Sequence, residues 1–94
     1  MKPILWNDDK NKSLKQERGI GFEDVIYYIE KEIVIDIIKH PDPNKCKNQR
    51  IYVININDYI YLVLFVESDE LIFLKTIIPS RRFTKLYLGG TKDE

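Results

Sequence analysis

The side chains best suited to chemistry are cations near the C-terminal end of this 94-residue chain. Ser80 is a residue type that caps helices, so a short helix is expected to run from Ser80 to Leu88, with Gly89-Gly90 as its stop. Arg81 and Arg82 then fall in its first turn, where each cation opposes the helix dipole by about 0.3–1 kcal/mol. Lys85 adds a like-charge pair at i, i+4 with Arg81. Local rules tend to be broken at functional sites, so the pattern indicates an anion site, in which helix N–H groups and arginine forks bind a phosphate.

The surrounding segment supports this interpretation. No acidic residue occurs between Leu71 and Lys92, yet the segment carries five cations: Lys75, Arg81, Arg82, Lys85 and Lys92. Lys75 alternates with Phe73 and Ile77 on an expected strand, which predicts that it shares their face. If that face looks toward the last helix, Lys75 and Arg81 could flank one phosphate. The competing interpretation is an ordinary solvated edge, since most surface charges need no function.

A second acid-free stretch, residues 43–57, contains Lys45, Lys47 and Arg50, and solvation explains it more simply. The whole chain has no net charge, which argues against a general nucleic-acid binder.

Several other kinds of chemistry are poorly supported. The chain has one histidine, His40, and one cysteine, Cys46, which excludes a zinc site with several Cys and His ligands. His40 is a minor general-base candidate, and Cys46 is more simply incidental. Gly19-Ile20-Gly21 lacks the third glycine of a dinucleotide-binding loop. We therefore expect neither a metal nor a cofactor.

The chain also offers no sign of a membrane segment or a leader. The longest apolar run, Tyr59 to Val66, is far shorter than the roughly 20 residues that cross a bilayer. Polar residues follow Trp6 directly, unlike a signal peptide. We expect a cytoplasmic protein without membrane contact.

The elements that must position the cations predict one α+β domain over residues 1–94. A polar helix is expected over 7–18, capped by Asn7 or Asp8 and ended by Gly19. The i, i+3, i+4, i+7 spacing of apolar residues from Phe22 predicts a second helix over 22–31. A strand over 33–38 and three more over 50–56, 59–66 and 71–78 predict a four-stranded antiparallel sheet.

Two details of this sheet are predictable. Asn57-Asp58 suits a two-residue hairpin with positive φ. The strand over 59–66 is apolar on both faces, so it should be central, and both faces should be covered, one of them by a partner if not by the chain itself.

Two segments resemble a known family. Trp6-Asn7-Asp8-Asp9-Lys10-Asn11, followed by Gly19-Ile20 and Phe22-Glu23-Asp24-Val25, is similar to the N-terminal signature of the BrnT-type toxins. Ile77-Ile78-Pro79-Ser80-Arg81-Arg82-Phe83-Thr84, followed by Tyr87, is similar to their C-terminal segment. In two places the chain departs from the family pattern. Glu17-Arg18 stands where Lys-His is common, and Pro-Ser-Arg replaces Ser-Ala-Arg.

The resemblance implies a RelE-like fold, metal-independent RNA endonuclease activity and a cognate antitoxin, for which it suggests the ribbon-helix-helix class. It matches Lys10 and Arg81 to the family's Lys and Arg, with Thr84 and Tyr87 following. The family's histidine has no counterpart at Glu17-Arg18.

The resulting hypothesis is the toxin of a type II toxin–antitoxin pair that cleaves RNA and so inhibits translation. Arg81 would bind the phosphate with Lys75 or Arg82 alongside. Lys10 would supply a second electrostatic contact, or act as an acid or base if it is buried. The remaining expected substrate contacts are Arg82, Lys85, Thr84 and Tyr87, the last by stacking on a base. A hetero-oligomer is expected, with an acidic antitoxin segment over the arginines. The alternative is an inactive relative that serves as a protein-binding module for its antitoxin-like partner.

Overall fold

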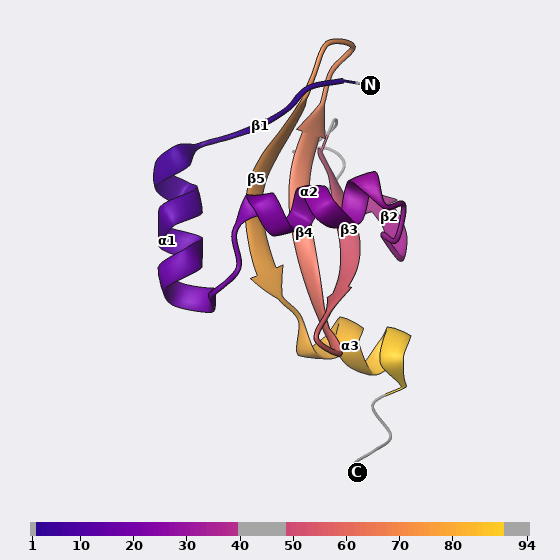
Figure 1. Ribbon diagram of the computed structural model, residues 1–94. Helices are drawn as coiled ribbons and strands as arrows, with labels where there is room; N and C mark the ends of the chain where they lie inside the picture. The colour runs from indigo at the N-terminus through magenta and orange to yellow at the C-terminus, as the bar shows by residue number, and fades with distance from the viewer. Residues whose placement is uncertain (1, 40–48, 90–94) are drawn as a thin grey trace.

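A computed structural model describes residues 2–39 and 49–89. The protein is a mixed α+β structure, which confirms the predicted class, with three helices and a five-stranded sheet among the described residues. Figure 1 labels the elements in chain order: β1 (Ile4–Trp6), α1 (Asp8–Arg18), α2 (Phe22–Glu30), β2 (Asp36–Lys39), β3 (Gln49–Ile56), β4 (Tyr59–Glu67), β5 (Ile72–Pro79) and α3 (Arg81–Leu88).

The sheet has the strand order β1-β5-β4-β3-β2. Strands β2 to β5 form the antiparallel meander that the sequence predicts, and β4 is central as expected. The predicted four-stranded, fully antiparallel sheet is wrong in one respect, because β1 pairs in parallel with β5, with Trp6 opposite Leu74. Three residues carry no strand pattern of their own, and pairing with the edge of β5 is what makes β1 a strand.

Helix ends follow local capping chemistry. The Asn7 side chain accepts a hydrogen bond from the Lys10 N–H at 2.9 Å, so Asn7 caps α1, and Gly19 ends it with φ of 72°. The hairpin between β3 and β4 is also confirmed, since Asn57 and Asp58 have φ of 54° and 64°. These features depend on a few neighbouring residues, which is why the sequence alone predicts them.

The expected strand over 33–38 is displaced. The strand is Asp36–Lys39, and the preceding residues form the connection from α2 instead. Glu32 turns the chain with φ of 57°, and Ile35 only begins the pairing, by donating its N–H to the Val53 carbonyl at 2.8 Å. The connection from α2 to β2 therefore contains Ile33, Val34 and Ile35, although their β-branched side chains favour a strand.

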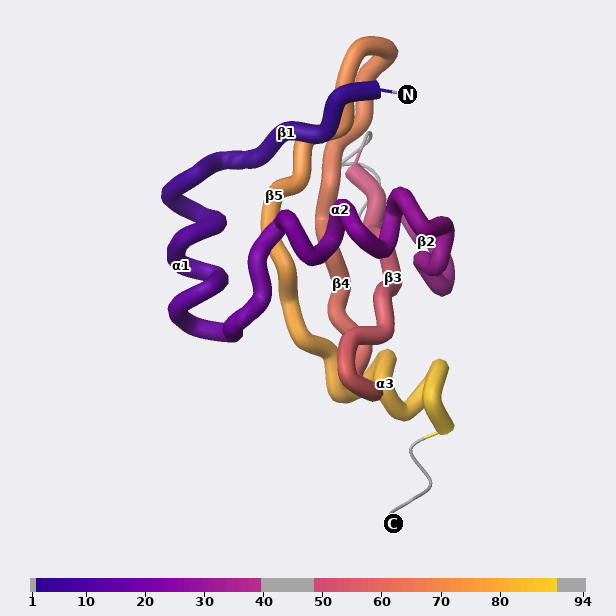
Figure 2. The backbone as a smooth tube through the Cα atoms, viewed as in Figure 1, coloured from indigo at the N-terminus to yellow at the C-terminus, as the bar shows by residue number. Residues whose placement is uncertain are grey.

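The two faces of the sheet are covered unequally. In Figures 1 and 2, α2 crosses one face in front of β3, β4 and β5. We call this the covered face, and its core includes Phe22, Val25, Val63, Phe65 and Ile77, each at most 1% exposed. On the opposite face α3 packs against one end of β4. We call the remainder of that side the open face. Its exposed or half-buried residues on β1, β5 and β4 are Leu5, Leu62, Leu64, Val66, Phe73, Thr76 and Ile78, whereas Ile51 and Val53 of β3 on the same side are 6% and 0% exposed.

A β-bulge in β5 overturns the predicted placement of Lys75. Leu64 pairs with Thr76, but the next residue of β4, Phe65, pairs with Leu74, so Lys75 is the extra residue. An extra residue shifts the alternation of side chains. Phe73 therefore lies on the open face and Ile77 on the covered face, and Lys75 cannot share one face with both as predicted.

Candidate phosphate-binding site on α3

The start of α3 is tied to the central strand by backbone and side-chain hydrogen bonds. The Ser80 N–H donates to the Ile60 carbonyl at 3.0 Å, and the Ile60 N–H donates to Thr84 Oγ1 at 2.9 Å. The Thr84 hydroxyl itself donates to the Ser80 carbonyl at 2.6 Å. The helix thus satisfies the backbone groups of β4 that lie beyond the end of β5, which fixes its first turn on the sheet.

Capping confirms the predicted limits of α3. Ser80 Oγ accepts a hydrogen bond from the Phe83 N–H at 3.1 Å, and Gly89 follows the helix with φ of 81°. The Thr84 hydroxyl, expected among the substrate contacts, is engaged inside the protein. We therefore assign Thr84 a positioning role.

The far end of α3 is held by Tyr87. Its hydroxyl donates to Asp36 Oδ2 on β2 at 3.1 Å, and its ring stacks on Phe83 with centroids 5.9 Å apart. Desolvation raises the pKa of Tyr87, and the hydrogen bond and charge of Asp36 raise it further. The phenol stays protonated and tethers the helix across β3 to the edge strand.

Three cations project from this fixed helix. Arg81, Arg82 and Lys85 are exposed, and the first turn contains no acidic residue. Within residues 2–39 and 49–89, the cations that form ion pairs are Lys2, Lys15 and Arg50. The three cations of α3 form none in these ranges. Arg81 and Lys85 lie one helical turn apart, so an anion near the helix start would meet both side chains and the free N–H groups.

Lys75 lies farther from Arg81 than the sequence suggested. Four more strand residues follow Lys75 before β5 ends, so its Cα lies on the order of 15–20 Å from that of Arg81 at about 3.3 Å per residue. The two side chains could flank a single phosphate only if both were fully extended toward it. Arg82 and Lys85 are nearer partners for Arg81.

Lys10 belongs with Lys75 rather than with Arg81. Trp6 and Leu74 form the last pair between β1 and β5, so α1 begins beside the bulge that holds Lys75. Both lysines are exposed. The predicted residues thus divide into a main group on α3 and a second group of two lysines at the β1–β5 junction, and no hydrogen bond or ion pair in the described ranges joins the two groups.

Arg50, from the second cationic stretch, is compensated. The Glu67 carboxylate accepts from Arg50 Nη2 at 2.8 Å and from Lys2 Nζ at 2.7 Å, and Arg50 also lies over the Phe65 ring at 5.7 Å. Arg50 pairs with Phe65, toward the opposite end of β4 from Ile60 and α3. It is therefore not part of the α3 site. Other residues singled out in the sequence lie outside the described residues: His40, Cys46 with its neighbours Lys45 and Lys47, and Lys92.

Sequence patterns gave no sign of the role of Asn11, the buried polar residue of α1. Its Oδ1 accepts from the Phe22 N–H at 2.7 Å, and its Nδ2 donates to both carboxylate oxygens of Glu23 at 3.0 Å. Lys15 adds an ion pair to Glu23 at 3.1 Å. The hydrogen bond from Asn11 is the main reason that the pKa of Glu23 is lowered. This cluster fixes α1, and with it Lys10, against the start of α2.

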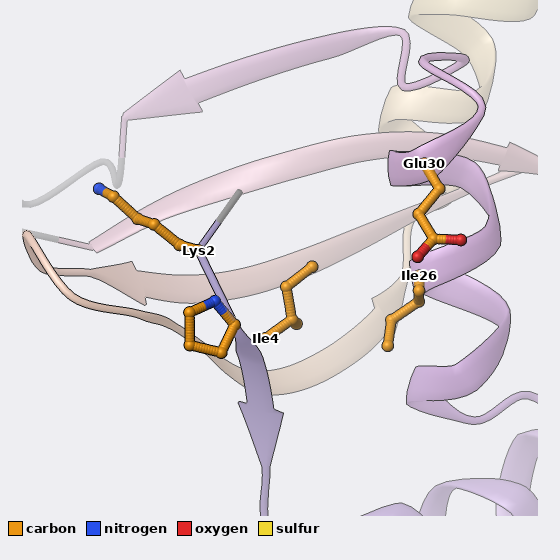
Figure 3. A pocket seen from close by; sticks show the side chains of 5 residues that line it. Lys2, Ile4, Ile26 and Glu30 are labelled. Carbon is orange, nitrogen blue, oxygen red and sulfur yellow. The ribbon is translucent and has the colours of Figure 1, made fainter.

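A hollow on the helix side of the sheet contains none of the predicted site residues. It has a volume of about 250 Å³ and lies between β1 and α2, lined by Lys2, Pro3, Ile4, Ile26 and Glu30 (Figure 3). Its one ammonium group, on Lys2, is already bonded to Glu67 and to the Ser68 carbonyl. The Glu30 carboxylate also lines it, so the hollow is a gap of mixed apolar and charged lining beside β1, away from the cations of α3.

Comparison of the chain with protein-family models, with curated proteins and with solved structures gave no significant match. Within the described ranges, no three His, Cys, Asp or Glu side chains gather as metal ligands. The helices described are too short or too polar to span a bilayer.

Proposed function

We propose that the protein is a BrnT-type toxin that cleaves RNA without a metal and is neutralised by a cognate antitoxin. The observation that carries the proposal is the pair Arg81 and Arg82 in the first turn of a rigidly anchored helix. The pair opposes the helix dipole and has no ion-pair partner among the described residues. The resemblance of the two terminal segments supports the same function.

The geometry suits electrostatic catalysis of RNA cleavage. In that reaction the 2′-hydroxyl loses its proton to water as its oxygen attacks the adjacent phosphorus. A 2′,3′-cyclic phosphate forms, the bond to the 5′-oxygen breaks, and the 5′-oxygen takes a proton from water. Negative charge builds on the phosphate oxygens, and preorganised donors stabilise it. Arg81 would bind this phosphate together with the N–H groups at the start of α3. Arg82 and Lys85 would bind the flanking backbone.

The remaining residues would act at a distance from the reacting phosphate. Lys10 and Lys75, at the β1–β5 junction, would bind RNA backbone farther along the chain. The exposed part of the Tyr87 ring, already stacked on Phe83, would extend that stack to a base. Thr84 would hold the helix start in place, through Ile60 and Ser80.

A cleavage assay with purified protein tests this assignment. Wild type, Arg81→Ala and Lys12→Ala would be incubated with a long unstructured RNA in excess EDTA, and cyclic-phosphate ends would be quantified. Arg81→Ala should cut at least about 100-fold more slowly, as when one donor to a developing oxyanion is lost. Lys12, an exposed cation of α1, is the matched control and should retain the wild-type rate.

Stability measurements show whether Arg81→Ala loses cleavage only because it unfolds. Because Arg81 opposes the dipole of α3, Arg81→Ala should melt at the same temperature as wild type or slightly higher. Equal cleavage by all three proteins would contradict the assignment of Arg81.

The second candidate is a non-catalytic binding module, and the open face favours it. The central strand places Leu62, Leu64 and Val66 there only half-buried. A protein that grips a partner through this face needs no reaction. Absence of cleavage by wild type, together with tight binding of a partner, would support this candidate.

A further inference from the structure

We infer that the open face binds an amphipathic helix of a protein partner, with its apolar side on β4 and β5 and its carboxylates on Arg81 and Arg82. The inference rests on the proposed function in one respect, since such a helix would occupy the same arginines that bind RNA. It names the surface by which a partner would silence the site.

The first observation is an incomplete layer. On the covered face of β4, Val63 and Phe65 are 0% and 1% exposed, because α2 packs over them. On the open face the neighbouring residues Leu62, Leu64 and Val66 are equally apolar but only half-buried. A central strand that is apolar on both faces is typical of a sheet covered on both sides. Among the described residues, α3 covers the end near Ile60, and Val53 and Ile51 of β3 are also buried on this side, so the incompletely covered part lies over β4, β5 and β1.

The second observation is the extent and chemistry of the patch. Ile78 pairs with Leu62 and is 40% exposed, and Leu5 pairs with Phe73 and is 47% exposed. The patch therefore spans β1, β5 and β4. Its members are aliphatic except for Phe73 and Thr76, and single-stranded RNA binds on aromatic platforms with cations rather than on aliphatic side chains. The apolar side chains of a protein helix fit this surface better.

The third observation is the charge at the border of the patch. Ile78 precedes Arg81 by three residues, so the apolar surface ends where the exposed cations of α3 begin. Residues 71–89 include no acid that could compensate them. A helix with leucines on one side and carboxylates beside them would satisfy both parts of the surface.

Defined peptides test this inference. One labelled 18-residue helix would carry Leu at i, i+3, i+4 and i+7 spacing with Glu at the polar positions, and a second would replace every Glu by Lys. Binding to the full chain would be measured by fluorescence anisotropy at several salt concentrations. The Glu peptide should bind at least about tenfold more tightly than the Lys peptide, and added salt should reduce this difference. Equal binding of the two peptides would overturn the inference.

Uncharged substitutions locate the peptide. Ile78→Gln should weaken binding of the Glu peptide about tenfold through lost apolar burial. Leu5→Gln, on another strand of the same face, serves as a second variant if the first does not fold. Ile37→Gln is the matched control, because Ile37 is 50% exposed on the covered-face side of β2. A peptide that binds both open-face variants as tightly as wild type would contradict the inference.

Two further readouts separate the alternatives. Sedimentation velocity would reveal a second copy of the chain on the patch, as a dimer that Ile78→Gln abolishes, and this result would overturn the choice of a foreign helix. Cleavage of RNA with and without the Glu peptide separates the two proposals. If the protein never cleaves RNA but binds the peptide through Ile78, the proposed function is wrong and the inference stands. If the protein cleaves RNA but binds neither peptide on this face, only the inference is wrong.

Discussion

Thr84 shows how one side chain can position a site without touching the substrate. Its hydroxyl accepts from the Ile60 N–H and donates to the Ser80 carbonyl. Thr84→Val keeps the shape but leaves the Ile60 N–H without a partner, which should lower the free energy of unfolding by about 1–3 kcal/mol. Thr84→Ser keeps the hydroxyl and should lose much less. Urea denaturation of the three proteins measures the difference, and equal losses for Val and Ser would contradict the positioning role.

At the scale of single elements, α2 has no side chain at its own cap. Gly21 stands at that position, and Asn11 of α1 supplies the acceptor for the Phe22 N–H instead. Gly21 also leaves room for this arrangement, since a Cβ there would lie 2.8 Å from Asn11 Oδ1 and 2.6 Å from Lys15 Cε.

Asn11 is therefore expected to stabilise two helices at once. Asn11→Leu should lower the free energy of unfolding by about 1–3 kcal/mol, because it leaves the buried Phe22 N–H unpaired and removes the hydrogen bond to the Glu23 carboxylate. Ser13→Ala is the control on the exposed side of α1 and should change stability little. Thermal melting monitored by circular dichroism tests this, and a melt of Asn11→Leu that matches the control would refute the shared cap.

The elements also show which features a sequence can predict. Helix caps and tight turns were predictable because they depend on residues within a few positions of one another. The examples are Asn7, Gly19, Ser80 and the Asn57-Asp58 turn. The parallel strand β1 was not, because it exists only through pairing with a strand far along the chain, as in the pair Ile4 and Ile72. The bulge at Lys75 likewise depends on the partner strand.

The candidate site follows the same division. The α3 cations and the cap that presents them are local features, so the sequence indicated them. The position of Lys75 relative to Arg81 depends on the bulge and on the length of β5, and the sequence-based expectation of a shared phosphate is correspondingly weakened. Asn11 and Glu23 were part of the family-like pattern, but only their contact in three dimensions gives them a role.

At the scale of the whole molecule, Glu67 links three parts of the sheet. It lies at the end of β4 and binds both Lys2, beside β1, and Arg50 of β3. The hydrogen bond from Lys2 is the main reason that the pKa of Glu67 is lowered from 4.5, and the charges of Lys2 and Arg50 lower it further, against partial desolvation.

A lowered carboxyl pKa fixes the sign of its pH dependence. The stabilisation by Glu67 is present above the unfolded value near 4.5 and is lost as the pH falls through the folded pKa. Glu67→Gln should therefore cost about 0.2–1 kcal/mol at pH 7, and the difference from wild type should shrink below pH 4.5. Denaturation at several pH values measures this. A difference that stays constant down to pH 2 would exclude the ion pairs as its cause.

Expression in a bacterium tests whether the protein is a ribonuclease toxin with Arg81 in its site. Wild type and Arg81→Ala would be induced at matched protein levels while growth is followed and new RNA 5′ ends are mapped. Wild type should arrest growth and produce new 5′ ends, and Arg81→Ala should do neither. Normal growth without new ends in wild type, or the same arrest and cleavage in the mutant, would contradict this assignment.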